Sequence, residues 1–270
     1  MPIFKHRIDL IPSLHALAVT VLQLTLYFLV ETPPVVVMAG LLIAPLCFLT
    51  VTITHNHFHV AIFNKLSLNR TIEMILFFQN GFTEGSWKPT HNLHHAYYLN
   101  RPGVRELQDP NNWRDVSTGH KRYLCRYIFP FILSHWKRHA SMSKARFRHG
   151  SSWNTRLVRL SIVLLLIWLH PLGAICLFFL PMALSQFLTA IHSYYQHAGL
   201  DTDNPYHASF NYHGPFYLYN IGYHTAHHLK PGLHWSKLAI EHQRISSEIP
   251  PQNMVGCYLS WAKYSNPVVK

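Results

Sequence analysis

The chain of 270 residues is poor in acidic residues and in cysteine. Asp and Glu total 11 against 23 Lys and Arg, which gives a formal net charge of +12. The four cysteines, Cys47, Cys125, Cys176 and Cys257, form no C-x-x-C pair, which argues against a disulfide framework, an iron–sulfur cluster or a cysteine zinc site. No H-E-x-x-H sequence is present, so the zinc-protease pattern is missing too.

The positive charge fits three kinds of partner: nucleic acid, an anionic membrane surface or an acidic protein. Apolar residues make up 49% of the chain and gather in long uncharged runs, which favours the membrane. No segment resembles a nucleic-acid-binding motif, so we expect no nucleic-acid partner.

Two pairs of apolar runs predict the fold. The first pair lies within about 10–54 and breaks at 31–34; the second lies within about 157–192 and breaks at 170–173. A helix of about 20 residues is about 30 Å long and matches the hydrocarbon core of a bilayer. The sequence therefore predicts an all-α integral membrane protein with four transmembrane helices in two hairpins. The apolar run 72–82 is too short to span and is predicted to be an interfacial or re-entrant helix.

The distribution of basic residues predicts the topology. Residues 60–156 hold 15 of the 23 basic residues, and neither hairpin turn holds any. The positive-inside rule places both termini in the cytoplasm, together with a helical cap formed by about 55–156 and 193–270. We expect the whole chain, 1–270, to be a single membrane-bound domain. The basic and aromatic stretch 120–148 is expected to lie on anionic head groups.

Histidine is the abundant polar residue, with 22 copies, and its spacing is unusual. The pattern H-x-x-H-H occurs twice, where on the order of 0.1 chance copies are expected, and another pair is spaced i, i+4. On a helix the three rings of such a motif fall within an arc of about 100°. Crowded imidazoles favour a bound metal ion, and eight of them favour two. The candidate ligands are His55, His59, His91, His94, His95, His224, His227 and His228.

The predicted topology brings all these histidines to one layer just beneath the membrane. An all-histidine shell with few carboxylates suits a redox metal pair, such as two irons that use dioxygen on an unactivated C–H bond; copper is possible on ligand type alone. The apolar spans would hold a hydrophobic substrate, such as a lipid. His57 points away from its neighbours on a helix and is expected to support them. His192 and His197 are about 140° apart on a helix, so they do not face one metal together.

The motifs H-x-x-x-H at 55–59, H-N-L-H-H at 91–95 and N-I-G-Y-H-T-A-H-H-x-x-P at 220–231 resemble the membrane-bound fatty acid desaturase and hydroxylase superfamily. The resemblance implies a non-haem di-iron centre, dioxygen as oxidant and a separate electron donor such as a ferredoxin or a b-type cytochrome. It also implies a further ligand ahead of the last motif, which we carry over to His197 after Gln196.

Two positions depart from the family pattern. Asn56 stands where an acid often follows the first histidine, and Ala226 stands where an acid often precedes the last pair. We expect desaturation of a fatty acyl lipid. The sequence R-P-G-V…D-P after the second motif also resembles carotenoid ketolases, so ketolation or lipid hydroxylation is the alternative. A non-enzymatic membrane protein that handles metal is a remote third, because a transporter should carry ionisable residues inside its spans.

Overall fold

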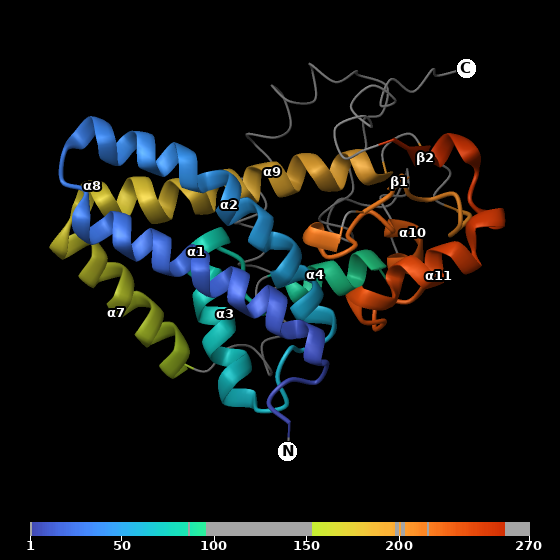
Figure 1. Ribbon diagram of the computed structural model, residues 1–270, viewed down its shortest axis with the longest axis horizontal. Coiled ribbons are helices and arrows are strands. Elements are labelled where there is room, and N and C mark those ends of the chain that lie inside the picture. Colours follow the sequence, from blue (N-terminus) through green and yellow to red (C-terminus); the bar gives the residue numbers. More distant parts are fainter. Residues whose placement is uncertain are drawn as a thin grey trace. The chain divides into compact units, whose positions relative to one another are not determined.

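The computed structural model describes residues 2–85, 87–95, 153–197, 200, 203–214 and 216–256 (Figure 1). Backbone contacts divide these residues into two units, each with its own packing. The first unit holds the described residues up to Gly85 and from 153 to Thr189; the second holds 87–95 and those from 190 onward. The basic stretch 120–148 and the ketolase-like sequence after the second motif lie outside the described residues.

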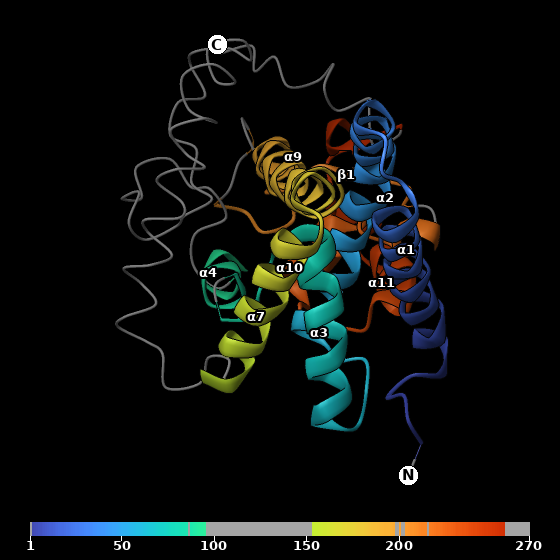
Figure 2. The ribbon, with the colours of Figure 1, turned by 90° about the vertical axis from the view of Figure 1, so that its left-hand side faces the viewer.

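The first unit is built from helices. In chain order they are η1 (Arg7–Asp9), α1 (Leu10–Leu29), α2 (Pro33–His59), α3 (Leu66–Asn80), α7 (Trp153–Leu169), α8 (Pro171–Ala174), a π-helical turn η5 (Ile175–Phe179) and the start of α9 (Leu180–His197). Helices α1, α2 and α3 pack against one another (Figures 1 and 2).

Three helices in the described residues are long and apolar enough to cross a membrane, within Arg7–Leu29, Pro33–His59 and Pro171–Ser193. They are candidates for three of the four predicted spans. The fourth, α7, is a helix of 17 residues, about 25 Å, and carries Arg156 and Arg159 in its first half. It does not reach the length of the other three, so a four-span arrangement stays a prediction.

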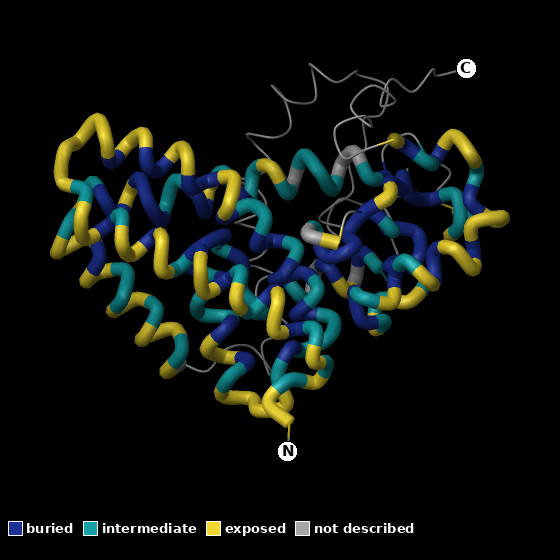
Figure 3. Tube along the Cα trace, viewed as in Figure 1, coloured by how far each residue is buried: buried dark blue, intermediate teal, exposed yellow. Residues whose placement is uncertain are grey.

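The long helices follow from their sequences. Pro33 and Pro34 open α2, where their fixed φ and missing N–H suit the first turn of a helix. In α1 the buried residues Ala16, Val19 and Gln23 recur every three or four positions, which places them on one face. Leucines and valines on the outer faces of α1, α2 and α7 are exposed (Figure 3), as expected for helices surrounded by lipid.

Helix α3 corresponds to the predicted short helix but begins at Leu66 and ends at Asn80. Gly81 follows in the left-handed region, with φ of 77°, and its N–H bonds the Phe77 carbonyl 2.8 Å away. The last two residues of α3 are buried amides. The Gln79 amide donates to the Ala16 carbonyl (2.6 Å), and the Asn80 amide donates to the Thr54 hydroxyl (2.8 Å). The polar end of α3 is therefore bonded to both α1 and α2.

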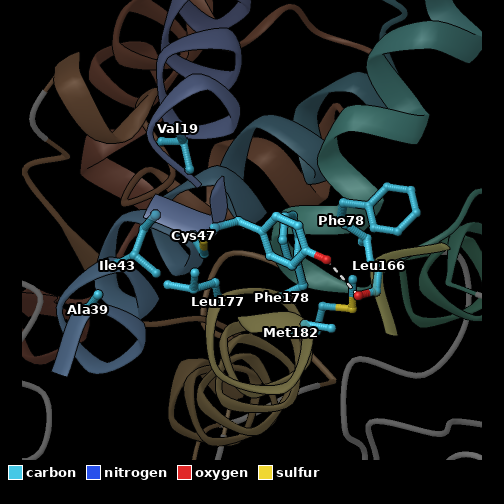
Figure 4. Close-up of a cluster of buried hydrophobic side chains, with 11 residues drawn as sticks. Val19, Ala39, Ile43, Cys47, Phe78, Leu166, Leu177, Phe178 and Met182 are labelled. Carbon is cyan, nitrogen blue, oxygen red and sulfur yellow. Dashed lines mark hydrogen bonds between the residues drawn. The ribbon is translucent and has the colours of Figure 1, made fainter. Parts of the chain in front are cut away.

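Tyr27 belongs to the cluster of buried hydrophobic side chains that forms the apolar core of this unit (Figure 4). Its hydroxyl donates to the Leu166 carbonyl, 2.6 Å away, and so links α1 to α7. The buried cluster consists of Val19, Tyr27, Ala39, Ile43, Cys47, Phe78, Leu166, Ala174, Leu177, Phe178 and Met182.

The π-helical turn η5 receives close contacts from α1 and α2. A π turn widens the helix and alters its backbone hydrogen bonds. The Gln23 amide of α1 donates to the Leu177 carbonyl at 2.8 Å and to the Phe78 carbonyl at 3.3 Å. Gly40 of α2 packs so closely that a Cβ on it would lie 2.4 Å from the Cys176 carbonyl oxygen.

The second unit consists of short elements joined by loops. They are α4 (Lys88–Leu93), the last turns of α9, β1 (Asn211–Tyr212), η6 (Phe216–Leu218), α10 (His224–Leu229), η7 (Trp235–Lys237), α11 (Leu238–Arg244), η8 (Ser246–Glu248), η9 (Pro251–Asn253) and β2 (Met254–Val255). Strands β1 and β2 pair in parallel, with Asn211 opposite Met254 and Tyr212 opposite Val255.

Replacing Gly40 with alanine tests the contact between α2 and the π turn. Alanine is the better helix former by about 1 kcal/mol, so propensity alone would stabilise the variant. The added methyl group would instead clash with backbone, and overpacking costs about 1–3 kcal/mol. We expect a lower thermal unfolding midpoint in detergent. Gly232→Ala is the control, since nothing lies within 4 Å of a Cβ there; an unchanged or raised midpoint for Gly40→Ala contradicts the close contact.

Candidate metal centre

The last histidine motif is held at the start of α10 by contacts to β1. The Asn211 side chain accepts from the Thr225 N–H at 2.9 Å and donates to the Thr225 hydroxyl at 2.8 Å. Gly222 lies against Tyr212, where a Cβ would stand 2.4 Å from the Tyr212 carbonyl oxygen. These contacts fix where α10 begins and hence the direction of His224.

One ion pair ties the far end of α10 to α11, and a second, within α11, holds the same carboxylate. The Lys230 ammonium lies 2.9 Å from the Glu241 carboxylate, and Arg244 binds the same carboxylate. Their hydrogen bonds lower the pKa of Glu241 to about 2, so it is ionised throughout the physiological range. The helix that carries three histidines is thus held at both ends.

Seven of the nine predicted ligands lie in the second unit and form two groups. The first histidine group is His91, His95 and His227. The His95 Nε2 atom lies 2.9 Å from the His91 Nε2 atom and 3.0 Å from the His227 Nε2 atom. The ligand atoms of this group lie within 4.8 Å of one another.

The second histidine group is His94, His197, His224 and His228. The His197 Nε2 atom lies 3.1 Å from those of both His94 and His224, and the His224 Nε2 atom lies 3.0 Å from that of His228. None of these four residues is more than 9% exposed. His94, which directly follows α4, therefore meets histidines of α9 and α10 in one buried cluster.

Hydrogen bonds alone do not satisfy these contacts. A ring nitrogen of neutral imidazole has either one hydrogen or one lone pair, so it takes part in one ordinary hydrogen bond. The Nε2 atoms of His95, His197 and His224 each face two other Nε2 atoms. A cation at the centre of each group would accept every lone pair at once.

The spacing of the nitrogens fits a transition-metal ion. Nitrogens that bind one ion at about 2.1 Å stand about 3.0 Å apart when they subtend 90°. The Nε2–Nε2 contacts in the two groups fall between 2.9 and 3.1 Å. Among the described residues, both groups offer only imidazole on this unit, with no cysteine or carboxylate. The donors present thus fit two metal positions.

The protonation of two rings also suits metal binding. The His197 Nδ1 atom lies 2.7 Å from the Ala208 carbonyl oxygen, which can only accept, so Nδ1 carries the hydrogen and Nε2 keeps its lone pair. Burial, reinforced by the neighbouring imidazoles of His224 and His197, holds the pKa of His228 well below its ordinary value of 6.5. His228 is therefore neutral at physiological pH, as a ligand must be.

His55 and His59 belong to the first unit. Helix α2 continues through both of them, so they share a face as predicted, with ring centroids 5.0 Å apart. Because they lie in a different unit from the two histidine groups, their part in the centre stays a prediction. His192 belongs to neither group in the described residues.

His57 has both ring nitrogens engaged in the first unit. The Ile62 N–H donates to Nδ1 at 3.3 Å, so Nε2 carries the hydrogen and donates to the Glu73 carboxylate at 3.2 Å. The ring joins the end of α2 to the following loop and to α3. The geometry agrees with the supporting role predicted for His57 and leaves no nitrogen for a metal.

Several supporting residues escaped sequence reasoning. No sequence motif identifies Asn211, Thr225 or the Ala208 carbonyl as supports of the histidines, because they act through contacts between loops. Tyr219 and Asn220 adopt the left-handed region, with φ of 51° and 56°, just before the last motif. His234 and His242 are buried as well. The ring centroid of Trp87 lies 4.9 Å from that of His91.

Long apolar helices and a buried all-histidine centre define a membrane protein equipped to bind metal. The chain belongs to the fatty acid desaturase family, whose sequence model matches residues 31–256. The match spans all three histidine motifs. No curated protein and no solved structure matches the chain.

Substitution of His57 tests its assignment as a support. His57→Leu removes both hydrogen bonds, which costs about 1–3 kcal/mol of stability because buried polar groups lose this partner. We expect a lower thermal unfolding midpoint and an unchanged metal content after loading with excess iron. His213→Leu, at an exposed position, is the control. Metal loss with an unchanged midpoint would show that His57 is a ligand.

Proposed function

We propose that the protein is a membrane-bound, non-haem di-iron oxidoreductase that uses dioxygen on a lipid, and that its main reaction is desaturation of a fatty acyl chain. The observation that carries the proposal is the pair of buried histidine groups inside a chain that matches the fatty acid desaturase family. Two irons would supply the oxidising power needed to remove hydrogen from an unactivated C–H bond. The protein supplies neutral, buried nitrogen ligands and keeps bulk water from them.

The ligand set follows from the two groups and the family pattern. The first histidine group would hold one iron and the second histidine group the other. Three imidazoles leave positions open on the first iron, and we assign these to His55 and His59, which face the same side of α2. The full proposed set is His55, His59, His91, His94, His95, His197, His224, His227 and His228.

The membrane arrangement is part of the proposal. The positive-inside rule supports both termini in the cytoplasm, with α7 as a fourth and shorter span whose exposed Arg156 would reach the head groups. The chain, 1–270, then acts as one desaturase-like domain with its metal-binding cap at the cytoplasmic surface. Electrons would come from a separate donor such as a ferredoxin or a b-type cytochrome.

The proposal and its alternative differ in the reaction that the protein would catalyse on the lipid. The sequence R-P-G-V…D-P, which resembles carotenoid ketolases, supports the alternative, ketolation or hydroxylation of a carotenoid or another lipid. Mass spectrometry of lipids from an expressing host decides between them. A product lighter by two hydrogens supports desaturation, whereas a product that has gained oxygen supports the alternative.

Alanine at His94 or at His227 tests both metal positions. Each variant should lose iron from one position. Removing a hydrogen-bond partner of a metal ligand lowers activity by about 10- to 100-fold. Removing the ligand itself should lower turnover by more than that. Iron content of purified protein and product formation in the host are the measurements. His213→Ala is the matched control, because His213 is exposed and outside both groups. Full iron content and full activity in both variants would refute the assignment.

A further inference from the structure

Gln196 connects two of the proposed ligands. It precedes His197 at the end of α9, and its side-chain amide nitrogen, Nε2, lies 3.1 Å from the Nδ1 atom of His224 on α10. Its backbone carbonyl accepts from the Phe210 N–H at 2.9 Å, which holds the residue against the loop before β1. The amide is therefore well placed to control the ring of His224.

The two nitrogens of the His224 ring have different partners. Its Nε2 atom faces His197 and His228 at 3.1 and 3.0 Å, so this is the atom that points to the metal. A neutral imidazole that gives its Nε2 lone pair to a metal carries its hydrogen on Nδ1. That hydrogen needs an acceptor, and Gln196 is the side chain in place to provide one. A rotation of the Gln196 amide group by half a turn exchanges its nitrogen and oxygen, so that the oxygen faces the Nδ1 atom of His224.

His197 and His224 thus differ in their supports. His197 donates from Nδ1 to the Ala208 carbonyl, a backbone group that can only accept. The partner of His224 is an amide that can accept or donate. Neither partner is charged, and Ala226 stands where an acid often occurs in the family.

We propose that Gln196 is the positioning residue of His224: its amide oxygen accepts the Nδ1 hydrogen and directs the Nε2 lone pair at the metal. The inference rests on the proposed di-metal function and goes further by naming what orients this ligand. A neutral acceptor raises the basicity of the ring less than a carboxylate does. Glutamate at this position, an obligate acceptor, would therefore hold the binding form of His224 more firmly than glutamine does.

Metal affinity tests the assignment without reference to turnover. Full-length protein in detergent, stripped of metal, is titrated with cobalt(II) while visible absorption and a competing chelator report binding. Gln196→Leu should weaken binding at the affected position by about 10-fold or more. Gln196→Glu should bind at least as tightly as the unsubstituted protein. The matched control is Gln243→Leu, at an exposed position on α11, which should leave affinity unchanged.

The outcomes separate this inference from the proposed function. Unchanged affinity in Gln196→Leu overturns the inference, because the amide then plays no part in binding. Gln196→Glu binding as weakly as Gln196→Leu overturns it too, because an acceptor oxygen at this position then does not support the ring of His224. Thermal unfolding of the stripped variants shows whether each one folds; equal midpoints with unequal affinities support the inference. If the unsubstituted protein binds no cobalt, or if His224→Ala binds it normally, the proposed metal centre itself fails.

Discussion

The structure depends on crowding imidazole nitrogens to about 3 Å from one another in a buried place. In both histidine groups at least one Nε2 atom faces two others, at 2.9 to 3.1 Å. Hydrogen bonds satisfy one contact per nitrogen, and burial removes water as a substitute partner. Such an arrangement is stable only with a cation that accepts several lone pairs together. The membership of the chain in the fatty acid desaturase family also supports the conclusion that these histidines bind metal.

The surrounding structure serves to hold those rings. In the second unit, Asn211 and Gly222 fix the start of α10, and the Lys230–Glu241 pair ties its end to α11. The Ala208 carbonyl fixes the tautomer of His197, and the Gln196 amide faces His224. In the first unit, the ring of His57 secures the end of α2, which carries His55 and His59. Uncharged groups do most of this orienting work at the second histidine group.

Sequence patterns predicted the long helices because these depend on local periodicity, whereas the ligand set drawn from the histidine spacing stays a prediction. Apolar runs anticipated α1, α2 and α9, although α2 extends beyond the predicted end and α3 begins earlier than the hydropathy suggested. The number of candidate histidines favoured two metal ions, and the structure brings seven of the candidates together in two groups that each mix residues of both H-x-x-H-H motifs. The supports were not predictable, since Asn211 reaches Thr225 across 14 residues of irregular chain. The same holds for Tyr219 and Asn220, whose left-handed backbone no residue type announced.

X-ray absorption at the iron edge, on purified full-length protein loaded with iron, tests the central claim most directly. An imidazole shell predicts nitrogen or oxygen neighbours at about 2.1 Å and the outer-shell carbon scattering of several histidine rings. A second iron should contribute its own scattering at about 3.5–4 Å. Sulfur neighbours at about 2.3 Å, or a spectrum without imidazole scattering, would contradict the account.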